Sequence, residues 1–209
     1  MPSPFTPPWS SLIPLIPVAD HAERVSAKFW LPHFHACGLA HQHAAIFGGR
    51  PSADLTRSRL LAHTYADPAH KCLEIFLWGY PDGGRGNLRA TFLQNIAAIS
   101  QNSPAILDWP DYYLSLHNLG GLGISTISKL AYFHGHRFGG HPALILDGRL
   151  IKVLADGNWT GLAMPCLRRE NAADFYPDYL QLLAVASARL GCPPDHLEFL
   201  LFAWGDSFR

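Results

Sequence analysis

Residues 116–154 of the chain read LHNLGGLGISTISKLAYFHGHRFGGHPALILDGRLIKVL. The letters LGGLG at 119–123 predict a tight hairpin, and a helix over 124–133 is predicted to follow it. Glycines on both sides of one apolar residue let the backbone turn tightly and lie close to a phosphate. The amides at the start of the next helix point toward that phosphate, and the helix dipole favours its negative charge. We therefore expect Gly121 and Gly123 to contact a phosphate backbone.

A carboxylate follows the hairpin at the end of an apolar run. The run ALIL at 143–146 leads into Asp147, which is predicted to begin a helix over Gly148 to Ala155. An aspartate at this place has two interpretations. It caps the amides of the new helix, or it supplies a negative charge to a reaction beside the hairpin. One residue can serve both purposes.

The hairpin and the aspartate together resemble the helix-hairpin-helix DNA glycosylases. The hairpin of that superfamily reads Leu-x-Gly-hydrophobic-Gly, and it is matched here by Leu119, Gly121, Leu122 and Gly123. The catalytic aspartate of the superfamily follows a short hydrophobic segment and begins a helix, which is the place that Asp147 holds. The hairpin with the downstream aspartate is much more specific than a Gly-Leu-Gly triplet alone.

Three further pieces resemble the 8-oxoguanine-glycosylase-fold proteins of bacteria, namely LWGYP at 77–81, SKL at 128–130 and LEFLLFAWG at 197–205. The resemblance covers residues 70–209, which we expect to form the glycosylase-like domain. Residues 1–69 contain no recognised pattern. They are expected to form an N-terminal arm, rich in proline at its start, with helices that pack on the main domain.

The resemblance implies a DNA glycosylase that flips a base out of double-stranded DNA and hydrolyses its N-glycosidic bond. The base is then an oxidised purine, or a bulky modified base of phage DNA in a defence role. Because the sugar becomes cationic as the base departs, Asp147 would stabilise that charge and orient the attacking water. The alternative is a non-catalytic helix-hairpin-helix module that binds DNA and uses Asp147 only as a helix cap.

Ser125 stands where the bifunctional members of the superfamily carry their catalytic lysine, two residues after the second hairpin glycine. A serine cannot form a Schiff base, so we expect a monofunctional, hydrolytic enzyme. Lys129 lies one helical turn further along and faces the same way as Ser125. A lyase step that depends on Lys129 therefore stays open, beside the interpretation of Lys129 as a phosphate-binding or solvent-exposed side chain.

Further contacts to DNA and to the flipped base are expected around the hairpin. Trp78 and Tyr80 are candidates for an aromatic base pocket, although Trp78 also suits a position in the core. Arg85, in a glycine-rich loop, and Arg149 are candidates for phosphate contacts, together with Ser125. The loop of Arg85 can equally be an ordinary surface loop.

The charge of the chain is balanced overall but not along its length. Lys and Arg total 16, and Asp and Glu also total 16, so the net charge indicates no polyanionic partner. Between Gly121 and Arg169, however, six Lys and Arg residues face only two Asp residues. This local excess suits a phosphate-facing surface, although a solvated face gives the same pattern. We expect a monomer whose partner is double-stranded DNA.

No cofactor is expected to be required. The four cysteines are scattered and lack the close C-terminal spacing that holds an iron–sulfur cluster in some glycosylases of this superfamily. The segment 33–43 contains four histidines and a cysteine, but no second pair of zinc ligands matches it elsewhere, so no metal site is predicted. The resemblance implies a monovalent cation bound by backbone carbonyls of the hairpin. Without a signal or membrane-spanning pattern, the expected location is the cytoplasm.

The apolar spacing predicts a chain built from helices. A chain of 209 residues that is 48% hydrophobic and 15% charged can bury a sizeable core, and no β-rich alternation stands out. The expected class is all-α or nearly so, with the helix-hairpin-helix DNA glycosylase fold as an irregular orthogonal helix bundle. Besides the helices around the hairpin and Asp147, helices are predicted over 20–34, 54–66, 69–80, 87–100, 108–118, 171–190 and 194–202.

Overall fold

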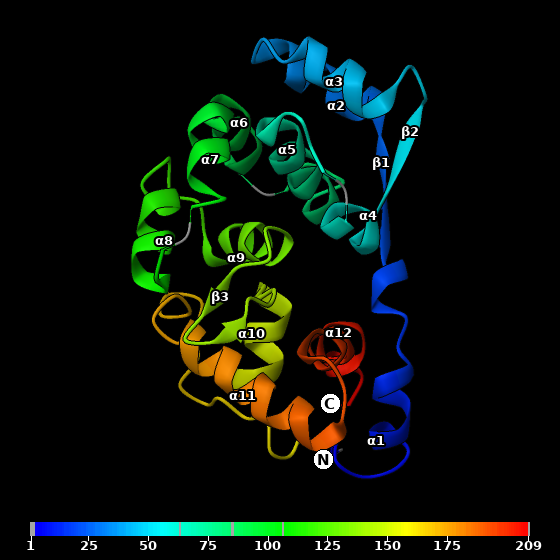
Figure 1. The fold of residues 1–209 in the computed structure, drawn as a ribbon, viewed down its shortest axis with the longest axis vertical. Coiled ribbons are helices and arrows are strands. Elements are labelled where there is room, and N and C mark those ends of the chain that lie inside the picture. Colours follow the sequence, from blue (N-terminus) through cyan, green and yellow to red (C-terminus); the bar gives the residue numbers. More distant parts are fainter. Residues whose placement is uncertain (1–2, 63, 85, 106, 209) are drawn as a thin grey trace.

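Helices build most of the protein in a computed structural model that describes residues 3–62, 64–84, 86–105 and 107–208 (Figure 1). The described residues form twelve α-helices, and the prediction of a nearly all-α fold is confirmed. The α-helices are α1 (Trp9–Leu12), α2 (Ala27–Ala36), α3 (Ala40–Phe47), α4 (Arg57–Ala62), α5 (Pro68–Gly79), α6 (Leu88–Gln94), α7 (Ile96–Asn102), α8 (Trp109–His117), α9 (Ile124–Phe133), α10 (Gly148–Ala155), α11 (Tyr176–Leu190) and α12 (Pro194–Trp204). The remaining elements are the 3-10 helices η1 (Ile13–Leu15), η2 (Val18–Asp20) and η3 (Gly205–Phe208) and the strands β1 (Ala22–Ser26), β2 (Ser52–Thr56), β3 (Arg137–Phe138) and β4 (His141–Pro142).

Strands β1 and β2 form an antiparallel pair that the sequence did not predict. Val25 pairs with Ala53, and both residues are buried together with Leu55. The helices predicted over 20–34 and 54–66 are therefore wrong at their starts, where the chain is extended, and right only for α2 and α4. Because α2 and α3 separate the two strands along the chain, the pairing is not visible in a local window.

Two other predicted helices differ from the structure. The helix predicted over 87–100 is two helices, α6 and α7, which meet at Asn95. The helix predicted over 171–190 begins only at Tyr176, because turns occupy the residues before it. The other predicted helices are confirmed within one or two residues at each end: 69–80, 108–118, 124–133, 148–155 and 194–202.

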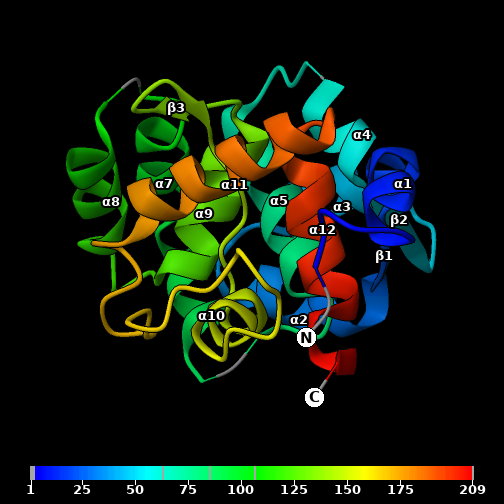
Figure 2. The same cartoon turned by 90° about the horizontal axis from the view of Figure 1, so that it is seen from below.

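Helix α9 lies in the middle of the structure, with other helices around it (Figure 1). Nine of its ten residues are buried, and α5 packs against it. On the other side, α12 packs against both α10 and α11, and Figure 2 shows these three helices lying together. Strand β1 packs on α5, and η2 packs on α12. The N-terminal segment thus lies against the same helices that surround α9.

Two expectations about organisation relate to this arrangement. The boundary placed between residues 69 and 70 falls in the first turn of α5 and stays a prediction. Within the described part of the chain, no helix has the length and apolar character needed to cross a membrane.

Candidate functional site

The hairpin turns tightly because two of its glycines, Gly120 and Gly121, have a positive φ. Gly121 has a φ of +75°, which L side chains rarely adopt. Gly123 has an ordinary extended backbone, with a φ of −85°, and it is the N-cap of α9. No other described residue has a heavy atom within 4 Å of the place where a Cβ of Gly123 would stand. Gly123 is therefore not needed for the turn itself, and it leaves open space at the first amides of α9.

Helix α8 holds the hairpin from behind through its last residue. The backbone N–H of Gly121 donates to the carbonyl of His117 at 2.7 Å, and Nδ1 of His117 donates to the carbonyl of Leu122 at 2.8 Å. His117 was not among the site residues predicted from the sequence, and its only signal there was its place shortly before the hairpin. The monovalent cation expected at the hairpin stays a prediction, and the Leu122 carbonyl there already accepts this hydrogen bond.

An open groove of about 650 Å³ runs past the hairpin. The starts of α9 and α10 both border it, so two helix N-termini, which attract anions, lie along one groove. Arg149 lines the groove, and so does Arg169, whose guanidinium stands over Gly148 and would be 2.7 Å from a Cβ there. These positive groups suit a phosphate backbone.

Lys129 is almost buried, and its side chain reaches back along α9. Its exposed fraction is 7%, and its Nζ donates to the hydroxyl of Ser125 at 2.8 Å and to the carbonyl of Ser125 at 3.2 Å. Nζ also lies 4.9 Å from the ring centroid of Tyr80, whose hydroxyl donates to Ser125 at 3.2 Å. Gly79 makes room for the lysine stem, because a Cβ there would lie 2.6 Å from Cδ of Lys129.

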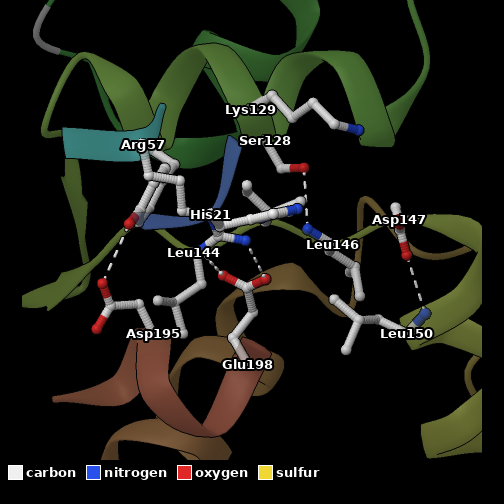
Figure 3. A network of polar contacts seen from close by, with 12 residues as sticks. His21, Arg57, Ser128, Lys129, Leu144, Leu146, Asp147, Leu150, Asp195 and Glu198 are labelled. Carbon is white, nitrogen blue, oxygen red and sulfur yellow. Dashed lines mark hydrogen bonds and ion pairs between the residues drawn. The ribbon is translucent and has the colours of Figure 1, made fainter. Parts of the chain in front are cut away.

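A small cavity of about 70 Å³ adjoins the groove. Lys129 and Asp147 line the cavity. Their respective neighbours Ser125 and Gly148 line the groove. Lys129, which contacts Ser125, and Asp147, which precedes Gly148, therefore lie between the cavity and the groove. Figure 3 shows the amine of Lys129, from α9, extending to the side on which Asp147 begins α10.

Asp147 caps α10 with one oxygen only. Its Oδ1 accepts the backbone N–H groups of Arg149 and Leu150, each at 3.0 Å, and Figure 3 shows the bond to Leu150. Its Oδ2 has no hydrogen bond to any described residue, so one oxygen of a cavity-lining carboxylate is not used by the cap. The predicted cap is confirmed, and the catalytic role stays a prediction.

Beyond Ala143, whose N–H donates to the carbonyl of His136 at 2.8 Å, side chains hold the apolar run 143–146. Tyr176 donates to the carbonyl of Leu144 at 2.6 Å, and Tyr179 donates to the carbonyl of Ile145 at 2.7 Å. The hydroxyl of Ser128 accepts the N–H of Leu146 at 3.0 Å. These bonds fix the backbone that leads into Asp147 relative to α9 and α11.

Three polar residues from the first third of the chain also line the cavity, and none of them was predicted from the sequence as a site residue. His21 precedes β1, Glu23 lies in β1, and Arg57 begins α4. The N–H of Arg57 donates to the carbonyl of His21 at 3.0 Å, next to the paired strands. The guanidinium of Arg57 donates to both carboxylate oxygens of Glu198, at 3.1 Å each, in an almost fully buried pair.

The cavity changes the proton affinities of these groups. Burial, aided by the charge of Arg57, lowers the pKa of His21 to about 4. Burial raises the pKa of Glu23, and the charge of Asp82 raises it further. Burial also raises the pKa of Glu198, against the opposite effect of Arg57. His21 is therefore neutral near pH 7, since its folded pKa lies well below that value.

The structure separates the two predicted aromatic pocket residues. Trp78 lines the cavity, whereas Tyr80 lines the groove and contacts Lys129. Arg149 lies over the ring of Phe202, 5.4 Å from its centroid, at the edge of the groove. Arg85 lies outside the described residues. Among the described residues, no group of three or more side chains is arranged to hold a metal ion.

The family described as "Putative 8-oxoguanine DNA glycosylase OGG-like protein" matches residues 16–202. The chain belongs to this family. The match begins at residue 16, so it includes most of the segment in which the sequence showed no recognised pattern. No curated protein and no solved structure matches the chain significantly. Family membership supports a DNA glycosylase in general, and DNA binding with it.

Proposed function

We propose that the protein excises a modified base from double-stranded DNA, with the DNA backbone in the groove and the flipped base in the cavity. The observation that carries this proposal is the place of Asp147 and Lys129, which line the cavity and lie between it and the groove. A base that turns from the groove into the cavity has its sugar at this boundary. The carboxylate and the amine then lie beside the bond that breaks.

Asp147 supplies the negative charge that the reaction needs. Breaking the N-glycosidic bond makes the sugar cationic, and a fixed carboxylate near C1′ stabilises that charge. Because Oδ1 is held by the cap, the direction of the carboxylate is set before substrate binds, and Oδ2 is left to face the sugar or the attacking water. Tyr179 and Ser128 support this geometry by fixing the backbone before Asp147.

The contacts of Lys129 favour a hydrolytic, monofunctional reaction. Its amine donates to a hydroxyl and a carbonyl and lies near a tyrosine ring, which are partners for a positive charge. A nucleophilic amine instead needs a free electron pair. We propose that Lys129 acts as a cation at the cavity mouth, and that water attacks C1′. A lyase step through Lys129 is the alternative, because the amine does reach the place of Ser125.

The size of the cavity favours a base without a large substituent. A volume of about 70 Å³ holds a few water molecules, so a purine would already require the cavity to widen, and a base with a bulky adduct would require a much larger opening. An oxidised purine therefore fits the proposal better than a bulky base of phage DNA.

Mass spectrometry of bases released from oxidised DNA and from hypermodified phage DNA tests the proposal. We expect a purine to be released from the oxidised DNA, leaving an abasic site. The variant Asp147→Asn should release the base far more slowly. Asp156→Asn is its matched control, because it changes the same group at the other end of α10. DNA binding without release of any base would instead support a non-catalytic binding module.

A further inference from the structure

Three buried polar atoms of residues that line the cavity have no hydrogen-bond partner within the described chain. They are Nδ1 of His21, Nε of Arg57 and Nε1 of Trp78, and all three residues line the cavity. Buried polar atoms are nearly always paired, because an unpaired one forfeits its hydrogen bonds to water. Three such atoms around one cavity indicate a polar ligand that binds there.

Rigid partners set the position and the hydrogen-bonding character of His21. Its ring packs against Trp78 and Phe199, with centroids 5.1 Å and 4.9 Å away. Nε2 lies 3.5 Å from a carboxylate oxygen of Glu23. We assign the hydrogen of the neutral ring to Nε2, which lies beside this carboxylate, and this assignment makes Nδ1 an acceptor.

The other two atoms are donors by their chemistry. Arg57 is 1% exposed; its two terminal nitrogens both bind Glu198, whereas its Nε–H, also a donor, has no partner among the described residues. The indole of Trp78 is 5% exposed and can only donate. The wall therefore combines two N–H donors with one acceptor nitrogen.

Building on the proposed function, we propose that His21, Arg57 and Trp78 are the residues that recognise the flipped base, and that they select a base with a ring carbonyl next to a ring N–H. The carbonyl would accept from Trp78 and Arg57, and the ring N–H would donate to His21. Adenine carries an amino group in place of the carbonyl, and a ring nitrogen of adenine has a single lone pair, so it cannot accept from both donors as a carbonyl can. A site with buried donors rejects a ligand that cannot pair them.

This assignment separates recognition from catalysis. The recognising wall comes from the N-terminal segment and α5, whereas Asp147 and Lys129 stand on the opposite elements, α10 and α9. Residues 1–69 would then decide which base enters the cavity, in addition to packing on the helices.

Binding of free bases tests the inference without requiring bond cleavage. In ¹⁵N-labelled protein, the indole N–H resonance of Trp78 is assigned by its loss in Trp78→Phe. We expect free hypoxanthine, which has the carbonyl and the N–H, to shift this resonance, and to bind about 10- to 100-fold more tightly than free adenine. His21→Phe, which keeps an aromatic ring, should lose most of that preference. The control Phe29→Leu changes a partly exposed aromatic ring outside the cavity and should keep it.

The outcomes distinguish this inference from the proposed function. If the protein releases no base but hypoxanthine binds selectively, the inference stands and the glycosylase proposal falls. If bases are released while hypoxanthine and adenine bind equally, or neither shifts the Trp78 resonance, the inference is overturned and the glycosylase proposal stands. Equal preference in wild type and His21→Phe would likewise remove His21 from the recognising wall.

Discussion

The amine of Lys129 donates a hydrogen bond to the hydroxyl of Ser125 over 2.8 Å, one helical turn closer to the hairpin. The lysine thus brings its amine to Ser125, the position that the resemblance described above predicts for the lysine of a bifunctional enzyme, but from a different position of the helix. The amine arrives there bound to the serine and near the ring of Tyr80. This contact places Lys129 in the candidate site beside the hairpin. Because its partners suit a positive charge, we expect Lys129 to act as a cation.

A borohydride trap separates the two mechanisms. We expect no covalent adduct between the protein and DNA, because no Schiff base forms, and the strand should be cut only after alkali or heat. Lys129→Ala should bind DNA more weakly by about 1 kcal/mol through a lost charge-assisted contact, with the chemical step near the wild-type rate. Lys152→Ala, which removes a charge from α10 outside the cavity, is the control. An adduct that Lys129→Ala prevents would make Lys129 the nucleophile.

Gly79→Ala should reduce base release by moving Lys129. The new methyl group would stand 2.6 Å from Cδ of Lys129, so the flexible stem must move away from it and enter the cavity. The free energy of unfolding should change little, because the preference of the helix for alanine over glycine, about 0.5–1 kcal/mol, offsets the cost of displacing the lysine stem. The double variant with Lys129→Ala should recover activity in single-turnover assays. Unchanged activity in Gly79→Ala alone would show that the lysine stem does not border the base site.

Replacing Gly121 or Gly123 of the hairpin by alanine should change the stability of the protein by different amounts. Gly121→Ala forces a left-handed backbone on a side chain and should lower the free energy of unfolding by about 1–2 kcal/mol. Gly123→Ala should cost less stability, since its backbone is extended, but its methyl would enter the space before the first amides of α9. Both should weaken binding of unmodified DNA of any sequence, measured by anisotropy. Normal binding of unmodified DNA by both variants would remove the hairpin from the interface.

The stability of the protein should fall between pH 6.5 and pH 4 partly through His134. Burial, aided by Lys71 and His136, lowers its pKa to about 3, so the unfolded chain takes up this proton and the folded protein does not. The contribution of His134 to the free energy of unfolding is therefore complete above pH 6.5 and is lost as the pH falls below that value. Denaturant unfolding of His134→Gln should show a slope in this window that is smaller by up to about 1.4 kcal/mol per pH unit. An identical slope would mean that His134 is protonated in the folded state.

The parts of the site that are local in sequence could be predicted, and the parts that depend on strand pairing could not. The hairpin and the cap of α10 are set by a few consecutive residues, so glycine spacing and an aspartate after an apolar run were sufficient signals. His21 and Glu23 were hidden inside a segment predicted to be a helix. They reach the cavity because β1 pairs with β2, which lies beyond two helices in the chain.

The support behind Asp147 was also beyond a sequence argument. Tyr176 and Tyr179 bind the carbonyls of the apolar run from α11, and nothing in the pattern of that helix distinguishes them from ordinary core tyrosines. Likewise, Trp78 and Tyr80 were treated as one aromatic pocket. Two residues apart at the end of α5, they face the cavity and the groove respectively.

Single-turnover base release by Asp147→Asn tests the central claim most directly. The amide oxygen keeps the cap of α10, so folding and DNA binding should match the wild type, while loss of the charge should slow release by about 100- to 1000-fold. Asp156→Asn should release the base at the wild-type rate. Release by Asp147→Asn at the rate of Asp156→Asn would show that Asp147 is only a helix cap and that the chemistry lies elsewhere.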